Sequence, residues 1–255
     1  MITGLKYKIE RIRRTRRRQR FLAAAKDYVA NTSSLRDILA YADGASSSVG
    51  VAITDYVALY RKIRTDRPSF VLECGTGRST MIIAQAMLDN LDRAPTDGIN
   101  LVSMEHDPKW YEHALSALPD QFEPFVEIRQ SPVDVYSYSF VRGTVYSEVP
   151  QYPYEFVFVD GPPQGVEGVV MCDMDLVRVV AGSETPVSAF IDNRKHTVLA
   201  CSLIFGPDKV SYYSGLSLGV VSSVTRHDMV LGDKERMRRT VFQSDIVSKK
   251  YGTPL

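Results

Sequence analysis

Five short apolar runs, each closed by a polar residue, recur along the chain from residue 70 onward. The closing residues are Glu73, Glu105, Gln130, Asp160 and Asp192, at intervals of 25 to 32 residues. Each interval leaves room for a crossover connection, which is the pattern of βαβ units and a parallel sheet. The helices expected between the runs cover residues 79–91, 108–118, 167–180 and 194–205. The pattern predicts an α/β fold with a central, mostly parallel sheet.

Two further β-rich runs, VSYYS and LGVVSSV, follow Gly206 with too few residues between them for a crossover. They are expected to form an antiparallel hairpin at one edge of the sheet. The tyrosine-rich stretch 134–153 is expected to be either an aromatic substrate wall or lid, or a packed surface loop.

The N-terminus is strongly basic. Residues 1–20 hold two lysines and seven arginines against one glutamate, a balance of +8 in a chain whose net charge is +1. The remaining chain is therefore acidic, at about −7. Such an arm could contact an anionic surface, either nucleic acid or membrane, or it could be a solvated helix that holds an oligomer together.

No glycine or proline occurs between Gly4 and Gly44. We expect a basic helix over roughly 5–30, then a short helix opened by Ser34 with Asp37 as its capping partner.

The chain is accordingly divided into a basic helical extension, 1–45, and a main domain, 46–255. A helix marked by Ile53, Tyr56 and Ile63 should lead into the first strand of that domain.

The spacing of the cysteines and the hydropathy of the chain limit the classes of protein to which it can belong. Cys74, Cys172 and Cys201 are scattered and lack CxxC spacing, which argues against a disulfide framework and a zinc site. No apolar run is long enough to span a bilayer, so no transmembrane segment is expected. These features predict a cytoplasmic protein, either free or peripheral to a membrane.

The stretch FVLECGTGRST, residues 70–80, carries the first candidate binding motif. Glu73 is followed by Gly75 and Gly77 where a strand ends and a helix begins, a turn that presents backbone N–H groups to a ligand. A dinucleotide fingerprint would need a third glycine where this chain has Thr80. Glu105 ends the next run, where a carboxylate can accept hydrogen bonds from both hydroxyls of a ribose.

The E-x-G-x-G order and the segment EHDPKW resemble the class I S-adenosylmethionine-dependent methyltransferases over about residues 50–225. The resemblance implies a Rossmann-like fold and S-adenosylmethionine as cofactor, bound by the acids and glycines just named. It further implies contacts to the cofactor from the loop after the third strand. Ser131 and Asp134 are the candidates in that loop. His106, which follows Glu105, and Asp160, which closes the fourth strand, are further candidates for binding the cofactor. Asp107 is expected to cap the next helix, with Pro108 in its first position.

Asp160 and the pair Asp192–Asn193 close neighbouring strands, and their oxygen atoms suit Mg²⁺. The arrangement resembles the metal-dependent O-methyltransferases of the catechol type. That resemblance implies a divalent cation, held by these three residues, that activates the acceptor hydroxyl. The catechol enzymes carry a lysine base three residues after the first aspartate, where this chain has Pro163.

Lys195 or His196 would therefore have to act as the base, or another residue is used. The alternative is that Asp160 only orients the cofactor or substrate and that Asp192–Asn193 caps the following helix.

The combined resemblance implies methyl transfer to a hydroxyl group of a small molecule or glycan. VDGPP and IDNRKH also loosely resemble methyltransferases that modify sugars and polysaccharides. Two alternatives remain: an RNA-directed methyltransferase or nucleic-acid-binding protein that uses the basic arm, and a nicotinamide-dependent oxidoreductase.

Overall fold

The computed structural model describes residues 16, 19–45, 52–91, 98–163, 172–229 and 248–250. Residues 19–30 are helical. The helices that follow are α2 (Ser33–Ala45), α3 (Ile53–Asp66), α4 (Arg78–Leu88), α5 (Pro108–Ala117), α6 (Asp175–Gly182) and α7 (Lys195–Phe205). Two short 3₁₀ helices are η1 (Asp120–Phe122) and η3 (Arg226–Asp228). The strands are β1 (Val71–Cys74), β2 (Leu101–Glu105), β3 (Val126–Gln130), β4 (Val133–Tyr138), β5 (Val141–Tyr146), β6 (Phe156–Val159), β7 (Val187–Asp192), β8 (Val210–Tyr213), β9 (Leu218–Val224) and β10 (Ser248–Lys250).

The central sheet has the strand order β10-β8-β9-β7-β6-β1-β2-β3. Strands β3, β2, β1, β6 and β7 are parallel, while β9 pairs antiparallel with both β7 and β8. The prediction of a mostly parallel α/β sheet with an antiparallel C-terminal hairpin is confirmed. All five polar residues that close the apolar runs lie in the last two positions of a strand or directly after one.

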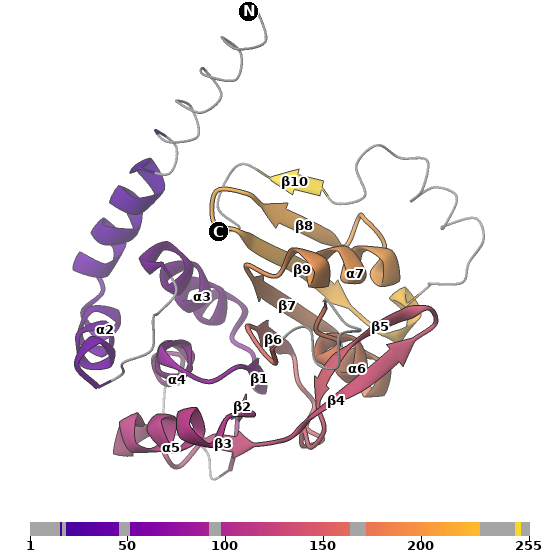
Figure 1. Cartoon of the computed structure of the whole chain (residues 1–255). Helices are drawn as coiled ribbons and strands as arrows, with labels where there is room; N and C mark the ends of the chain where they lie inside the picture. Colours follow the sequence, from indigo (N-terminus) through magenta and orange to yellow (C-terminus); the bar gives the residue numbers. More distant parts are fainter. Residues whose placement is uncertain are drawn as a thin grey trace, which may run out of the picture.

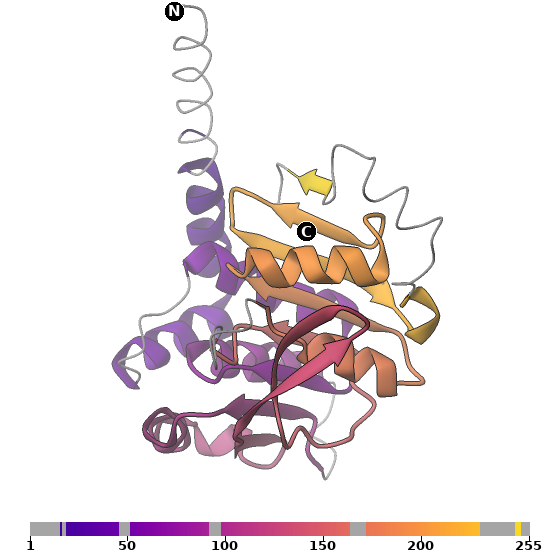
Figure 2. The ribbon, with the colours of Figure 1, turned by 45° about the vertical axis from the view of Figure 1, so that its right-hand side comes forward.

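Helices cover both faces of the sheet (Figures 1 and 2). Alternate residues of each strand point to opposite faces. In β6, Phe156 and Phe158 pack with α3, α4 and α5, while Val157 and Val159 pack with α6 and α7. Because both of its faces are buried, β6 is a continuous apolar run, whereas β3 at the edge of the sheet alternates between apolar and polar residues.

The N-terminal segment is packed against the main domain. Leu35, Ile38 and Ala42 of α2 are buried in the core that contains α3 and α4, and Ala25 of helix 19–30 joins the same core. The proposed boundary at residue 45 therefore does not separate two independent cores. Residues 1–15, 17 and 18, which carry most of the basic charge, lie outside the described residues.

The predicted cap at Ser34 is wrong. Ser34 lies inside α2, and its hydroxyl donates to Asp89 Oδ2 at 2.6 Å and lies 3.2 Å from the hydroxyl of Tyr60. The side chain therefore ties α2 to α3 and α4 instead of opening the helix. Asp37 accepts from its neighbour Arg36 at 3.1 Å.

The interval between the third and fourth predicted strands holds an antiparallel pair, β4 and β5, which forms a separate two-stranded sheet. Most of the tyrosine-rich stretch lies in this hairpin, and Tyr146 of β5 is buried. The helix predicted over 167–180 begins later, at Asp175; residues 172–174 are not helical, and 164–171 lie outside the described residues.

The three cysteines are free and buried. Within the described ranges, no helix has the length and apolar character needed to cross a membrane.

Candidate functional site

The order of the strands changes direction at β1. The chain runs outward from β1 to β2 and β3, and β6 and β7 are then added on the other side. Ligands of open α/β sheets bind at the carboxyl ends of the strands beside such a switch point. Strand alternation places Glu73, Glu105 and Asp192 on the face covered by α3, α4 and α5.

The backbone turns after β1 and β6 touch one another at the switch point. Gly75 has φ +99°, and a Cβ built on it would lie 2.9 Å from the carbonyl carbon of Asp160. A Cβ on Gly161 would lie 2.9 Å from the Cα of Gly75. Glycine is required at Gly75 both by its conformation and by this approach.

Glu73 is fully buried beneath the glycine turn. Its Oε2 accepts hydrogen bonds from Thr80 Oγ1 at 2.5 Å and Ser103 Oγ at 2.6 Å. Thr80 Oγ1 in turn accepts from Gly77 N at 3.1 Å, so the carboxyl group holds the turn through one hydroxyl. Burial raises the pKa of Glu73 to about 7. Its Oε1 is buried without a hydrogen-bond partner among the described residues.

Glu105 ends β2 and is almost fully buried. Its Oε1 accepts from the backbone N–H groups of His106 and Asp107 at 2.7 and 2.9 Å, and it lies 2.8 Å from His106 Nδ1. Asp107 caps α5 by accepting a hydrogen bond from Lys109 N at 2.8 Å, and Pro108 is the first residue of the helix. Both features were predicted. The loop thus fixes one oxygen of Glu105.

Ser131 directly follows β3, where its backbone N–H donates to Glu105 O at 2.8 Å, and Asp134 lies in β4. The buried hydroxyl of Ser131 donates to Pro132 O at 3.0 Å and accepts from Glu148 N at 3.0 Å. Asp134 is exposed in β4, and its Oδ1 accepts from Val135 N at 2.7 Å. Ser131 already uses its hydroxyl to hold the chain locally, so a cofactor contact from either residue stays a prediction.

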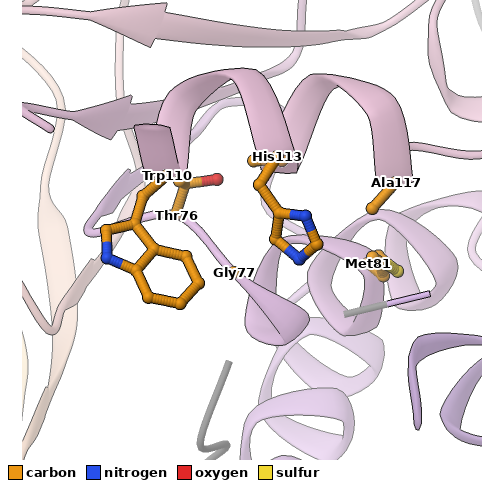
Figure 3. A pocket seen from close by; sticks show the side chains of 7 residues that line it. Thr76, Gly77, Met81, Trp110, His113 and Ala117 are labelled. Atoms are coloured by element: carbon orange, nitrogen blue, oxygen red, sulfur yellow. The ribbon is translucent and has the colours of Figure 1, made fainter. Parts of the chain in front are cut away.

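A narrow cleft separates the glycine turn from α5 (Figure 3). It is lined by Thr76, Gly77, Met81, Trp110, His113, Ala114 and Ala117. Trp110 and His113 project from α5 toward the turn, and their rings meet edge to face at 5.9 Å. The sequence analysis missed this cleft, although Trp110, in the first turn of α5, is the single tryptophan of the chain.

Arg194 connects the ends of β6 and β7. Its Nη1 donates to Pro162 O at 2.9 Å and to Asp173 Oδ1 at 3.0 Å, and its Nη2 donates to Asp160 O. Its Nε lies 3.6 Å from Asp160 Oδ1. The guanidinium group thus holds the turn after β6 against the start of α7.

Asp192 closes β7 and is 9 % exposed. Burial, together with the charges of Asp160 and Asp55, raises the pKa of Asp192 to about 7, although Arg194 lowers it. The pKa of Asp160 is also raised by burial and lowered by Arg194. The two carboxyl groups therefore interact, as their positions on adjacent strands predict.

Asp173 is a member of this cluster that the sequence analysis missed. It is buried, with Oδ1 bound to Arg194 and Oδ2 accepting from Thr197 Oγ1 at 2.7 Å. No spacing rule links residue 173 to residues 194 and 197. The only local signal is the aspartate inside the apolar segment VVMCDMDLV.

The remaining candidates are outside the buried cluster. Asn193 is exposed with φ +49°, and its backbone N donates to Ser217 O at 2.9 Å. Lys195 and His196 are exposed on the first turn of α7. The residue that caps α7 is Arg194, which makes no side-chain cap, so the alternative that Asp192–Asn193 caps this helix is wrong.

The predicted metal site offers two carboxyl groups and one amide oxygen. Among the residues that the structure describes, no three His, Cys, Asp or Glu side chains form a group that could hold a metal ion. The positive charge beside Asp160 is supplied by Arg194, and a permanent cation there repels a second one. The metal set Asp160, Asp192 and Asn193 therefore stays a prediction.

No protein-family model and no curated protein matches the chain. Solved structures with a similar fold include an O-methyltransferase from Bacillus cereus in complex with SAH, at 16 % identity over 78 % of this chain and 97 % of that one, with a TM-score of 0.46. Another is the O-methyltransferase TomG from Streptomyces achromogenes in complex with SAM, at 20 % identity over 64 % and 63 %, with a TM-score of 0.39. A methyltransferase-like protein from Silicibacter pomeroyi matches at 16 % identity over 72 % and 93 %, with a TM-score of 0.40. These likenesses are distant, and the function has to be argued from the site itself.

Proposed function

We propose that the protein is an S-adenosylmethionine-dependent methyltransferase that acts on a hydroxyl oxygen of a small molecule or glycan. One observation carries the proposal: the glycine turn after β1 touches the turn after β6, with Glu105 on one side and Asp192 on the other. A cofactor site and an acidic acceptor site are thereby adjacent at the switch point of the sheet.

The described residues fit the cofactor. The turn at Gly75 and Gly77 brings backbone N–H groups to the start of α4, and Glu105 offers a carboxylate oxygen for the ribose hydroxyls. Glu73 lies buried beneath this turn, and an acid at this position favours a ligand with a cationic group. When bound, S-adenosylmethionine would supply an electrophilic methyl group.

Asp192 is the residue best suited to take the proton of the acceptor hydroxyl. It is nearly buried at the carboxyl edge, and a carboxyl group whose pKa is about 7 exchanges protons readily near neutral pH. Arg194 would keep the neighbouring Asp160 ionised and hold both strand ends in place. The exposed positions of Lys195 and His196 make them weaker candidates.

The cofactor can be tested by calorimetric titration. S-adenosylhomocysteine should bind in the micromolar range and raise the melting temperature, because a ligand that binds only the folded state stabilises it. NAD should do neither, since the third glycine of the dinucleotide fingerprint is Thr80. Binding of NAD without binding of S-adenosylhomocysteine would contradict the proposal and favour an oxidoreductase.

The role proposed for the basic arm is contact with an anionic surface. Its charge supports this proposal, and the arm precedes every candidate site residue in the chain. Deletion of residues 1–18 should leave S-adenosylhomocysteine binding unchanged and weaken binding to anionic vesicles or RNA at low salt. If the two proteins bind these partners equally, the arm acts in another way, such as oligomerisation.

A further inference from the structure

A second and larger cavity lies between helix 19–30, α3 and the turn that joins β8 to β9. Its volume is about 260 Å³, larger than the engineered cavity of about 150 Å³ that admits benzene. It is lined by Phe21, Ala24, Ala25, Asp27, Tyr28, Asn31, Thr54, Val57, Ala58, Arg61 and Leu216. Figures 1 and 2 both show the helix beside the β8–β9 turn.

Packing contacts hold the walls of this cavity together. A Cβ on Gly215, in the β8–β9 turn, would lie 3.3 Å from the ring of Phe21. Tyr28 meets Tyr60 of α3 edge to face at 6.3 Å, and Arg61 of the same helix lies 5.4 Å from the centre of the Tyr28 ring. The N-terminal helix is therefore a wall of the cavity rather than a separate arm.

One end of the cavity adjoins the acidic end of β7. Thr54, at the start of α3, lines one wall of the cavity. On the opposite wall, Leu216 precedes Ser217, whose carbonyl accepts from Asn193 N at 2.9 Å. Asp192 itself is paired with Leu218. The wall formed by the β8–β9 turn thus ends beside the proposed proton acceptor.

The lining indicates the chemistry of an occupant. Phe21 and Tyr28 offer aromatic surface, and the alanine, valine and leucine side chains are apolar. Asp27 and Arg61 carry opposite charges, so the lining has no net charge. An uncharged molecule with a ring that can pack on aromatic faces suits this lining, because such pockets combine apolar walls with a few polar groups.

We propose that this cavity takes the methyl acceptor, an uncharged hydroxylated ring whose hydroxyl group lies at the Asp192 end. The inference rests on the proposed methyltransferase function and assigns its acceptor site to helix 19–30, α3 and the β8–β9 turn. The ring can come from a phenol or from a pyranose, which share one apolar face and a neutral hydroxyl.

Two neighbouring alanines of helix 19–30 provide a matched test. Ala24 lines the cavity and Ala23 does not, while both are exposed, so a tryptophan at either position should leave the fold intact. Saturation-transfer NMR on the full chain would measure binding of catechol and of methyl α-glucopyranoside. Calorimetry with S-adenosylhomocysteine on the same three proteins would report the cofactor site separately.

At least one probe should bind the unmodified protein and Ala23→Trp equally, and bind Ala24→Trp at least about tenfold more weakly, since pocket-filling changes of a few atoms have effects of this size. S-adenosylhomocysteine should bind all three alike. Equal probe binding to both variants, or no binding of either probe, overturns the acceptor site. Failure of S-adenosylhomocysteine to bind would instead remove the methyltransferase function, while probe binding still reports on the cavity. The probe that binds distinguishes a phenol from a pyranose.

Discussion

Arg194 donates to Asp173 Oδ1 at 3.0 Å, although 21 residues separate them in the chain. The same guanidinium group binds the carbonyl groups of Asp160 and Pro162. A single side chain therefore ties the turn after β6, the segment before α6 and the start of α7 into one unit. That unit forms the acidic end of the proposed active site.

Replacement of Arg194 by alanine should lower the free energy of unfolding by about 3–5 kcal/mol, because it removes one partner of a buried ion pair. Urea denaturation would measure the change. Arg226→Ala is the matched control: its ion pair with Glu184 is exposed on both sides, so the loss should be about 0–1 kcal/mol. Equal losses in the two variants would show that Arg194 has no special structural role.

Removal of divalent cations should leave methyl transfer unchanged. The charge that compensates Asp160 belongs to Arg194, which EDTA cannot remove. Activity would be measured with and without EDTA, and the melting temperature with and without Mg²⁺ or Mn²⁺. Loss of activity with EDTA and its return with Mg²⁺ would restore the metal site at Asp160, Asp192 and Asn193.

Replacement of Glu105 by alanine should weaken S-adenosylhomocysteine binding by about 1.5–3 kcal/mol, the usual contribution of hydrogen bonds to a charged group. Calorimetric titration measures the difference. Glu112→Ala, which removes an exposed acid of α5, should leave binding unchanged. If both variants bind like the unmodified protein, the ribose is held elsewhere.

Glu73 should make stability depend on pH. Its pKa is raised from 4.5 to about 7, so between these values the folded state binds more protons than the unfolded state. The free energy of unfolding should therefore fall as pH rises from about 4.5 to about 7, by an amount on the order of 3 kcal/mol. Glu73→Gln should reduce this contribution, because the amide does not ionise. Chemical denaturation at pH 5 and pH 7.5 would compare the two proteins, and identical pH dependence would mean that Glu73 does not titrate in this range.

Local sequence determined the features that depend on neighbouring residues. Glu105 closes an apolar run and is the last residue of β2. Helix α5 begins at Pro108 because the carboxylate of Asp107 caps the backbone N–H of Lys109. The parallel direction of β1, β2 and β3 was predicted from the intervals between them, which are long enough for a crossover connection. These signals act over a few residues, so they can be recognised in the sequence alone.

Tertiary structure decided which distant groups meet. Serine is a common residue at helix N-caps, but the hydroxyl of Ser34 donates to Asp89, 55 residues away in the sequence. The packing of α2 on α4 brings the two side chains together. The sequence also did not show that Arg194 is the cation beside the two aspartates. Its guanidinium group forms ion pairs with Asp160 and Asp173, which lie far from it in the sequence. The contact of Phe21 with the β8–β9 turn likewise depends on the path of the whole chain. Such contacts have no fixed spacing in the sequence, because their energy is gained only after the sheet has brought the segments together.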